Sequence, residues 1–372
     1  MIKLSPSDFY KVRPLFEPLM AYQMFCAGVL NGLYSGQVFV DDSDNPRNGL
    51  VSKDSMWWFL AGDAQNEGFN KAINTAIFDR TLSGEKGWGG MLVCYPDDWD
   101  VQIPVIFAPR IPIKTNRLHY LCRQMKLNWR THIPGGFEVR FVDQSLVEDG
   151  IEIPGTVANV LALRKDDPEP DHKAAGFVAL HNQNIVAYAV IDCIVNKGGD
   201  IGLYTDPEFR HRGLAYVTSA AIIEYALSHD VEVVHWDCES FNMGSIRTAE
   251  KLGLQLSHEH TMYHLILDPV LHEVNRAWSH LDAGRYKQAV EVCKEHVDAG
   301  HESAHPHFYY VLARCCAESG RPDEAMQNLE LAAKFGWDSA DEMKADFQAM
   351  ANYKTWDSIL EQVQSNAQAK GQ

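Results

Sequence analysis

The chain has little positive charge for its length. Lysine and arginine total 33 against 50 aspartates and glutamates, which leaves a formal net charge of -17 over 372 residues. Nucleic acids are bound through basic surfaces, so this deficit argues against a nucleic-acid partner. It favours a cationic partner instead, although surplus carboxylates also serve simply to keep a protein soluble.

Long apolar segments are also lacking. No apolar run reaches the length of about 18 residues that a membrane-spanning helix needs, so we expect no membrane association. The first six residues, Met-Ile-Lys-Leu-Ser-Pro, do not form a basic and then apolar leader. We therefore expect a cytoplasmic protein that carries no export signal.

Metal-binding and disulfide patterns are missing as well. The eight cysteines show no Cys-x-x-Cys spacing, and several lie within apolar runs. We expect them to be reduced and buried. The one histidine-rich stretch, residues 301–307, contains a proline and no cysteine. It therefore predicts solvated linker histidines, and we expect no metal cofactor.

One segment combines a strand, a turn, a loop and a helix. Ile201–Thr205 is apolar and compatible with a strand, Pro207 marks a turn, and residues 215–227 are apolar at helical spacing. Gly213 removes the Cβ where the helix begins. The backbone N–H groups of residues 210–215 are therefore expected to point outward beside the positive end of the helix dipole, where a pyrophosphate would bind.

The surrounding pattern predicts a mixed sheet with helices on its faces, an α/β (α+β) fold. The predicted strands are residues 136–142, 176–180, 185–195, 201–205, 232–238, 255–256 and 261–267, the last two separated by the charged His258–His260. Residues 153–163 read as a helix, and residues 181–184 as the tight turn of a hairpin.

Two motifs in this region resemble the signatures of a known superfamily. Arg210-x-x-Gly213-x-Ala215, after a Thr-x-Pro strand end, resembles the acyl-coenzyme A signature of the GNAT superfamily of N-acetyltransferases. Asn242-x-x-Ser245, with a later Lys-x-Gly, resembles the second signature and stands at the right distance. The resemblance implies a GNAT fold for residues 135–268. Long members with an N-terminal lobe resemble the zwittermicin-resistance type.

The resemblance also implies a chemistry and a set of binding residues. A neutral amine would attack the thioester of acetyl-CoA directly, without a covalent enzyme intermediate. The residues implied for the pyrophosphate are Arg210, His211, Arg212, Gly213, Leu214 and Ala215. Those implied for the pantetheine arm are Leu203, Tyr204, Thr205, Asn242 and Ser245, with one strand amide polarising the thioester carbonyl.

The acid and the base are less clear from the motifs. Many members place an acidic tyrosine where this chain has Ala249. The remaining candidates are Glu239 and Asp200 as bases, and Tyr204, at the end of one of the two strands that separate to admit the cofactor. The carboxylates, Asp237 included, have structural alternatives as a turn residue, a solvated group or a helix cap. Cys238 is not expected to be a nucleophile, because strand alternation puts the nearby histidine on the other face.

Residues 1–134 carry no recognised motif but look folded. A hairpin, strand, helix and strand at residues 36–95 repeat the rhythm of residues 176–238. We expect a degenerate GNAT-like copy. Asp63–Asn66 replaces the basic glycine loop, so no coenzyme A is expected there, and the glycine-rich residues 84–90 predict an ordinary loop.

Residues 269–372 are predicted to be helical throughout. Ala277, Gly284 and Ala289 recur as Ala313, Gly320 and Ala325, an offset of 36 residues. This is close to the period of about 34 residues in a tetratricopeptide repeat. Residues 305–337 fit better than 270–299. Helices at 340–351 and 353–363 are expected to cap the array, and the residues from Ser365 onward to be frayed.

Three functions follow from these patterns. The first is an acetyltransferase that modifies a small amine, for which a polyamine or amino-antibiotic is plausible by resemblance. The second is an acyl-CoA-binding sensor of weak activity, which Ala249 favours. The third is a protein acetyltransferase whose helical repeat recruits its protein substrate, as concave helical arrays often bind peptides.

Overall fold

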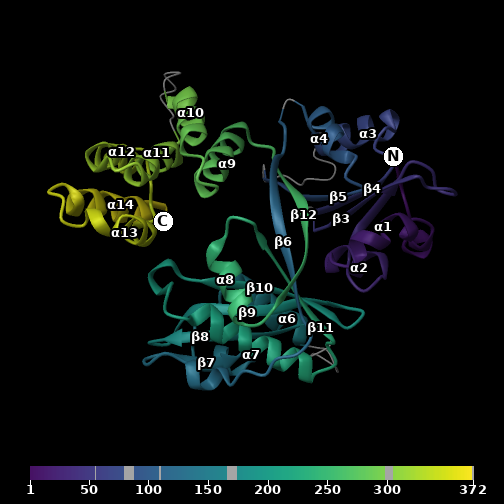
Figure 1. Ribbon diagram of the computed structural model, residues 1–372, viewed down its shortest axis with the longest axis horizontal. Coiled ribbons are helices and arrows are strands. Elements are labelled where there is room, and N and C mark those ends of the chain that lie inside the picture. Colours follow the sequence, from purple (N-terminus) through teal and green to yellow (C-terminus); the bar gives the residue numbers. More distant parts are fainter. Residues whose placement is uncertain (55, 79–87, 109, 166–173, 298–304, 371–372) are drawn as a thin grey trace. The chain divides into compact units, whose positions relative to one another are not determined.

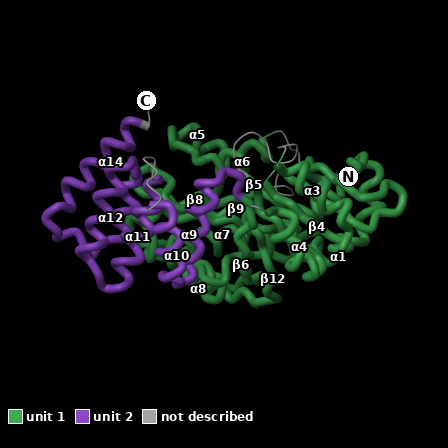
Figure 2. Tube along the Cα trace, turned by 90° about the horizontal axis from the view of Figure 1, so that it is seen from above, with its two compact units in different colours: residues 1–265 green, residues 266–372 purple. Residues whose placement is uncertain are grey.

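The computed structural model describes residues 1–54, 56–78, 88–108, 110–165, 174–297 and 305–370. The chain divides into two compact units, Met1–Leu265 and Ile266–Gln372 (Figure 2). Each unit is described by itself below.

The first unit is built on one mixed sheet (Figure 1). Across the described residues the sheet has twelve strands in the order β1-β2-β3-β4-β5-β12-β6-β11-β10-β9-β8-β7. The strands are β1 (Ile2–Lys3), β2 (Gln37–Val40), β3 (Asn48–Lys53), β4 (Trp57–Gly62), β5 (Trp88–Tyr95), β6 (Ile113–Cys122), β7 (Glu138–Phe141), β8 (Ala175–His181), β9 (Asn184–Val195), β10 (Gly198–Thr205), β11 (Val233–Glu239) and β12 (Gln255–Ile266).

Helices pack on both faces of this sheet (Figure 1). They are α1 (Arg13–Met20), α2 (Met24–Leu30), α3 (Glu67–Phe78), α4 (Trp99–Ile106), α5 (Ser145–Glu148), α6 (Gly155–Arg164), α7 (Leu214–Ser228) and α8 (Met243–Lys251). Short 3-10 helices are η1 (Pro6–Lys11), η2 (Trp129–His132) and η4 (Pro207–Phe209). The predicted helices at 66–78, 153–163 and 215–227 are confirmed as α3, α6 and α7.

The unit contains the same strand order twice. In the first copy β2, β3 and β4 are antiparallel, and α3 leads to the parallel β5. In the second copy β8, β9 and β10 are antiparallel, and α7 leads to the parallel β11. The fold is therefore α/β with a second, GNAT-like pattern in the N-terminal half, as the sequence predicts.

The two copies exchange their last strands. β6 pairs with β11 of the second copy, and β12 lies between β6 and β5 of the first. The GNAT fold implied for residues 135–268 therefore takes one strand of its sheet from outside that range, because β6 comes from residues 113–122. Local alternation of apolar residues does not encode which strand a given strand will pair with. The division into 1–134, 135–268 and 269–372 stays a prediction.

A second correction concerns β12. The two short strands expected at 255–256 and 261–267 are one strand, with a register shift against β6 between Leu256 and His258. The charged His258–His260 lies inside it. The charged run predicts an interruption, but here His260 joins a polar network described below.

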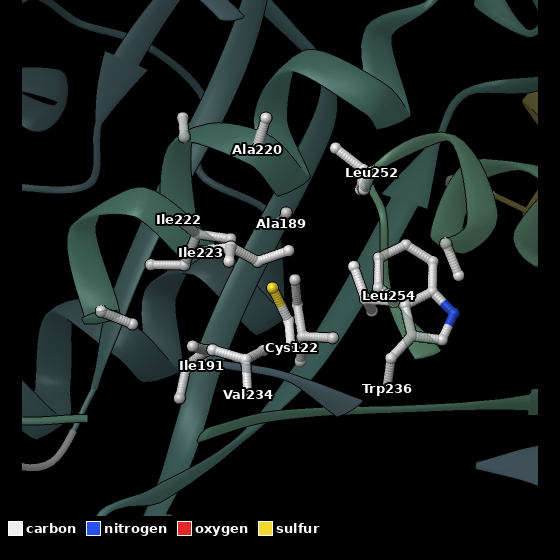
Figure 3. Packing of buried hydrophobic residues seen from close by; sticks show 14 of the residues in the cluster. Cys122, Ala189, Ile191, Ala220, Ile222, Ile223, Val234, Trp236, Leu252 and Leu254 are labelled. Carbon is white, nitrogen blue, oxygen red and sulfur yellow. The ribbon is translucent and has the colours of Figure 1, made fainter. Parts of the chain in front are cut away.

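The main core lies between the sheet and α7 (Figure 3). α7 is buried on nearly all sides, since it carries alanine, valine and isoleucine with few polar groups. Ile191 of β9, Val234 and Trp236 of β11, and Ile222 of α7 meet there. On the opposite face, α1 and α2 cover the first copy and extend to β9. All eight cysteines are free, and all but the half-buried Cys94 are buried, as expected.

The second unit consists of helices in its described residues. They are α9 (Pro269–Asp282), α10 (Tyr286–Val297), α11 (Pro306–Glu318), α12 (Pro322–Lys334), α13 (Ala340–Asp346), η5 (Gln348–Met350) and α14 (Trp356–Lys370). The four repeated alanines are fully buried, and Gly284 and Gly320 both adopt a positive φ where a helix ends. The expected fraying from Ser365 onward is wrong, because α14 continues to Lys370.

Candidate functional site

The parallel strands β10 and β11 diverge soon after they meet. Only Gly198–Asp200 pairs with Val233–His235, although β10 continues to Thr205 and β11 to Glu239. The register of β10 against β9 shifts between Asp200 and Ile201, where the separation begins. This β10–β11 opening leaves the edge of Leu203–Thr205 without a neighbouring strand on the β11 side.

The equivalent strands of the first copy stay together. β4 and β5 are paired from Trp57–Met91 to Ala61–Tyr95. A parallel pair that is hydrogen-bonded along its length has no main-chain groups left for a ligand. The first copy therefore lacks an opening between these strands, and the expectation that residues 1–134 do not bind coenzyme A stays a prediction.

The segment after β10 forms a cradle of backbone N–H groups. His211 and Gly213 adopt positive φ angles of 61° and 86°, and α7 begins at Leu214. Within the part of the chain that the structure describes, the N–H groups of residues 211–216 have no hydrogen-bond acceptor, whereas Val217 N donates to Gly213 O at 3.1 Å. These unpaired donors stand at the positive end of the α7 dipole, which suits an anion.

The cradle is shifted by one residue from the expected one. The N–H of Arg210 donates to Pro207 O at 3.3 Å, so this amide is not available to a ligand. The reason is the 3-10 turn Pro207–Phe209, which uses the amide to close. The exposed guanidinium of Arg210 lies 3.4 Å from Thr205 O through Nε, and that of Arg212 lies 3.2 Å from Glu208 O.

The second motif has structural roles within the chain. Asn242 caps α8, because its Oδ1 accepts a hydrogen bond from Ser245 N at 3.1 Å. The Ser245 hydroxyl accepts one from Trp236 Nε1 at 3.0 Å. Both residues stand beside the end of β11, and their contact with a cofactor stays a prediction.

Asp200 lies at the root of the β10–β11 opening. It is opposite His235 of β11 in the parallel register. Burial raises the pKa of Asp200 to about 8, and the charges of Asp237 and Asp192 act in the same direction. A carboxyl group that titrates near neutral pH is suited to general-base work.

The other two catalytic candidates differ in their surroundings. Glu239 lies 3.0 Å from Arg117 Nη1 and 3.2 Å from His264 Nε2. Burial opposes ionisation, but the hydrogen bond from His264 and the Arg117 charge lower the pKa of Glu239. It is therefore a paired anion and a weaker base than Asp200. Tyr204 is exposed and stacks on Tyr188, with ring centroids 5.5 Å apart.

A buried network of charged groups lies beside the opening, on the face of the sheet away from α7. Asp237 Oδ2 is 2.7 Å from His260 Nε2 and 3.3 Å from His119 Nδ1, while Arg117 Nε donates to Oδ1. Burial opposes it, yet these hydrogen bonds and the Arg117 charge hold the pKa of Asp237 well below its usual range. The alternative that Asp237 caps a helix is wrong, because it lies within β11 and Asn242 is the cap.

His119 and His235 continue this network. Their nitrogens Nε2 and Nδ1 are 3.1 Å apart. Burial and the neighbouring His119 lower the pKa of His235 to about 4. Sequence reasoning missed Arg117 and His119 because they lie on the exchanged strand β6. A usable signal existed: polar residues alternate in Arg117-x-His119, His235-x-Asp237-x-Glu239 and His258-x-His260.

A cavity of about 170 Å³ lies at the seam between β5 and β12. Its walls carry tyrosines and carboxylates. The residues that matter for its chemistry are Tyr22, Tyr95, Asp97, Asp100, Glu259 and Tyr263. Lys114 Nζ lies 2.7 Å from one oxygen of Asp100. His260, the partner of Asp237, also lines the cavity, so this histidine connects the cavity wall to the network on β11.

Other candidate chemistries have less support. Burial raises the pKa of Cys238, which disfavours its thiolate. No group of three or more metal-ligating side chains is arranged to hold an ion within the described residues. The histidine-rich stretch lies mostly outside them, since 298–304 are not described. None of the described helices is both long and apolar enough to pass through a membrane.

Comparison with known proteins decides the family. Residues 13–263 match the family model of the GNAT acetyltransferases. The chain belongs to this family. This GNAT protein is therefore an acyltransferase, and residues 280–341 match a tetratricopeptide repeat model, as the offset of the small residues predicts.

Two relatives illustrate the extent of the similarity. An uncharacterized N-acetyltransferase, YdfB, of Bacillus subtilis (strain 168) is 24% identical over 263 residues, which are 70% of this chain and 97% of the relative. A GCN5-related N-acetyltransferase-like protein of Streptococcus suis 89/1591 has a similar structure, with a TM-score of 0.53 and 20% identity over 70% of this chain and 98% of its own.

Proposed function

We propose that this GNAT protein transfers an acetyl group from acetyl-CoA to a primary amine by direct attack in a ternary complex. The β10–β11 opening, with the N–H groups of 211–216 at its mouth, carries this proposal. The diphosphate would bind those amides, with Arg210 and Arg212 adding charge-assisted contacts. The pantetheine arm would run along Leu203–Thr205, where one N–H would stabilise the oxyanion.

In the reaction the amine nitrogen forms a bond to the acetyl carbon, and the bond from that carbon to sulfur breaks. Asp200 takes the proton that the ammonium group gives up, because its raised pKa matches this task. The leaving thiolate must also gain a proton. Ala249 is buried in the core and supplies no hydroxyl, so the exposed Tyr204 is the candidate acid.

A cationic acceptor is favoured by the cavity at the seam. Asp97 and Glu259 are exposed carboxylates on its wall, and Tyr22, Tyr95 and Tyr263 also line it, so aromatic rings are available for cation–π contacts with an ammonium group. A polyamine or an amino-antibiotic fits this chemistry and the resemblance to the zwittermicin-resistance type.

Isothermal titration of the full chain with acetyl-CoA, followed by a thiol-release assay over a panel of amines, tests the proposal. We expect binding and release of one thiol for each amine consumed. Binding without release from any amine would support instead an acyl-CoA sensor, which the buried Ala249 favours. Absence of binding would refute both.

A protein acetyltransferase is the third candidate, because the helical repeat of residues 280–341 belongs to a class that often binds peptides. A chain that lacks residues 270–372 separates it from the first. Small amines should still be acetylated by the shortened chain, whereas a protein substrate should be lost.

A further inference from the structure

Strand β9 extends beyond its neighbour β8. The first residue of β8, Ala175, pairs with Ile191, so within the described residues Cys193–Val195 have β10 on one side and no β8 residue on the other. The N–H and C=O groups on that open side need other partners, because unpaired backbone groups are costly when buried.

Tyr34 from the first copy supplies these partners. Ile194 N donates to the Tyr34 hydroxyl at 2.9 Å, and the same hydroxyl lies 3.4 Å from Ile194 O, to which it donates. One side chain thus takes the place of a strand residue. The ring fits because position 28 is glycine: a Cβ there would lie 2.4 Å from Tyr34 Cδ2.

Helix α2 covers the same part of β9. Met24 and Ala27 pack with Cys193 and Val195 in one buried cluster. Met24 also reaches β10, since a Cβ at Gly198 would lie 3.1 Å from its sulfur. Two independent contacts from the first copy therefore hold this short segment.

The segment lies directly opposite the root of the opening. Gly198–Asp200 pairs with Cys193–Val195 on one side and with Val233–His235 on the other. In the described chain these are the only residue pairs that join β10 to β11. A displacement of Ile194 would therefore shift its partner Gly199, which precedes the last residue of β10 that pairs with β11.

We propose that the first copy, which has neither a cradle nor an opening, works as a clamp for the second. Tyr34 is a positioning residue that fixes the root of the β10–β11 opening and so sets the affinity for the acyl thioester. The identity of that ligand rests on the proposed function. The role of Tyr34 in holding the root of the opening does not depend on which ligand binds there.

The test uses full-length Tyr34→Phe in two measurements. Tyr34→Phe removes both hydrogen bonds of the hydroxyl. Loss of the one that Ile194 N donates should raise amide exchange at Ile194 about fivefold, and the increase should spread to residues 198–200 and 233–235. The dissociation constant for CoA should rise about threefold or more. Gly28→Ala, which displaces the ring, should act in the same direction.

Tyr310→Phe is the matched control. It removes a hydroxyl bonded to Asp346 at 2.9 Å in the helical unit, so it should leave CoA binding unchanged. The clamp would be overturned if the exchange increase stayed confined to Ile194. It would also be overturned if the wild type bound CoA and Tyr34→Phe left the dissociation constant unchanged. If the wild type binds no CoA, the proposed function fails, while the spread of exchange still decides the clamp.

Discussion

The imidazole Nε2 of His260 lies 2.7 Å from Oδ2 of Asp237, although their strands β12 and β11 are separated in the sheet by β6. The contact reaches across the exchanged strand, where His119 bonds the same oxygen at 3.3 Å. One carboxylate thus connects three strands. The packing of β6, β11 and β12 against one another therefore involves paired charges as well as apolar contacts.

Replacing this carboxylate should weaken the fold. Asp237→Asn leaves Arg117, whose side chain is only 15% exposed, with Glu239 as its remaining anion. We expect the free energy of unfolding in urea to fall by about 3 kcal/mol, because a buried charge loses a partner. Asp98→Asn, at an exposed position, is the control and should change it little. A loss equal to that of the control would contradict the pairing.

Mild acid should reduce the stability that His235 contributes to the fold. His235 has a pKa of about 4 when folded, against 6.5 for an ordinary histidine side chain. Between these values the unfolded chain binds a proton that the folded chain does not bind, so the contribution of His235 to the free energy of unfolding falls as the pH decreases from 6.5 to 4. The raised pKa of Asp200 contributes in the opposite direction, so the comparison with His235→Gln isolates the histidine. Urea titrations at several pH values should show a smaller slope for His235→Gln. Equal slopes would exclude His235 as the source.

Acetylation should respond to pH through Asp200. Its pKa of about 8 means that the basic form accumulates as the pH rises through that value, so the rate should rise as well. Asp200→Asn should lose this limb and lower kcat by about a hundredfold, the lower range for a general base. CoA affinity should be retained. If kcat and the profile survive the change, another group is the base.

The amine should bind at the seam. Asp97→Asn removes an exposed carboxylate from the cavity wall, whereas the adjacent Asp98, also exposed, does not line the cavity. We expect the KM for a diamine to rise about fivefold in Asp97→Asn, equivalent to ~1 kcal/mol, and to stay constant in Asp98→Asn. If the two changes had equal effects on the KM, the cavity would not be the binding site of the amine.

The cradle can be tested with two glycines of equal conformation. Gly213 and Gly253 have φ angles of 86° and 84°, and neither would meet another atom within 4 Å if a Cβ were added. Both alanine variants should lose about 1 kcal/mol of stability through backbone strain. Only Gly213→Ala should also weaken CoA binding, because it moves the N–H groups of the cradle. If both variants bound CoA equally well, Gly213 would not be required for CoA binding.

Local patterns anticipated much of the second copy and the repeat. Gly213 has a positive φ where the chain turns into α7, and a glycine at that position is enough to predict the turn. The small residues of the repeat are equally local, since Ala277 and Ala313 must be small for two helices to approach. The prediction that the amide of Arg210 is available to a ligand is wrong, because this N–H donates to Pro207 O and closes the turn Pro207–Phe209.

The polar network could not be assembled in the same way. Arg117 and Asp237 are 120 residues apart in the chain and meet only because β6 lies beside β11. Alternating polar positions mark one face of each strand, but alternation is the same for every partner strand. The alternatives for Asp237 therefore stayed open until the strand order was known.

The amino-acid order alone indicated most elements of the second copy, the loop of N–H groups before α7 and the helical repeat, since each depends on residues within one turn, one strand or one period. Tertiary structure decided the exchange of β6 and β12, the contact of Tyr34 with Ile194 and the pKa of Asp200. These depend on which distant groups share a buried space, where desolvation and charge act over a few ångströms irrespective of separation along the chain.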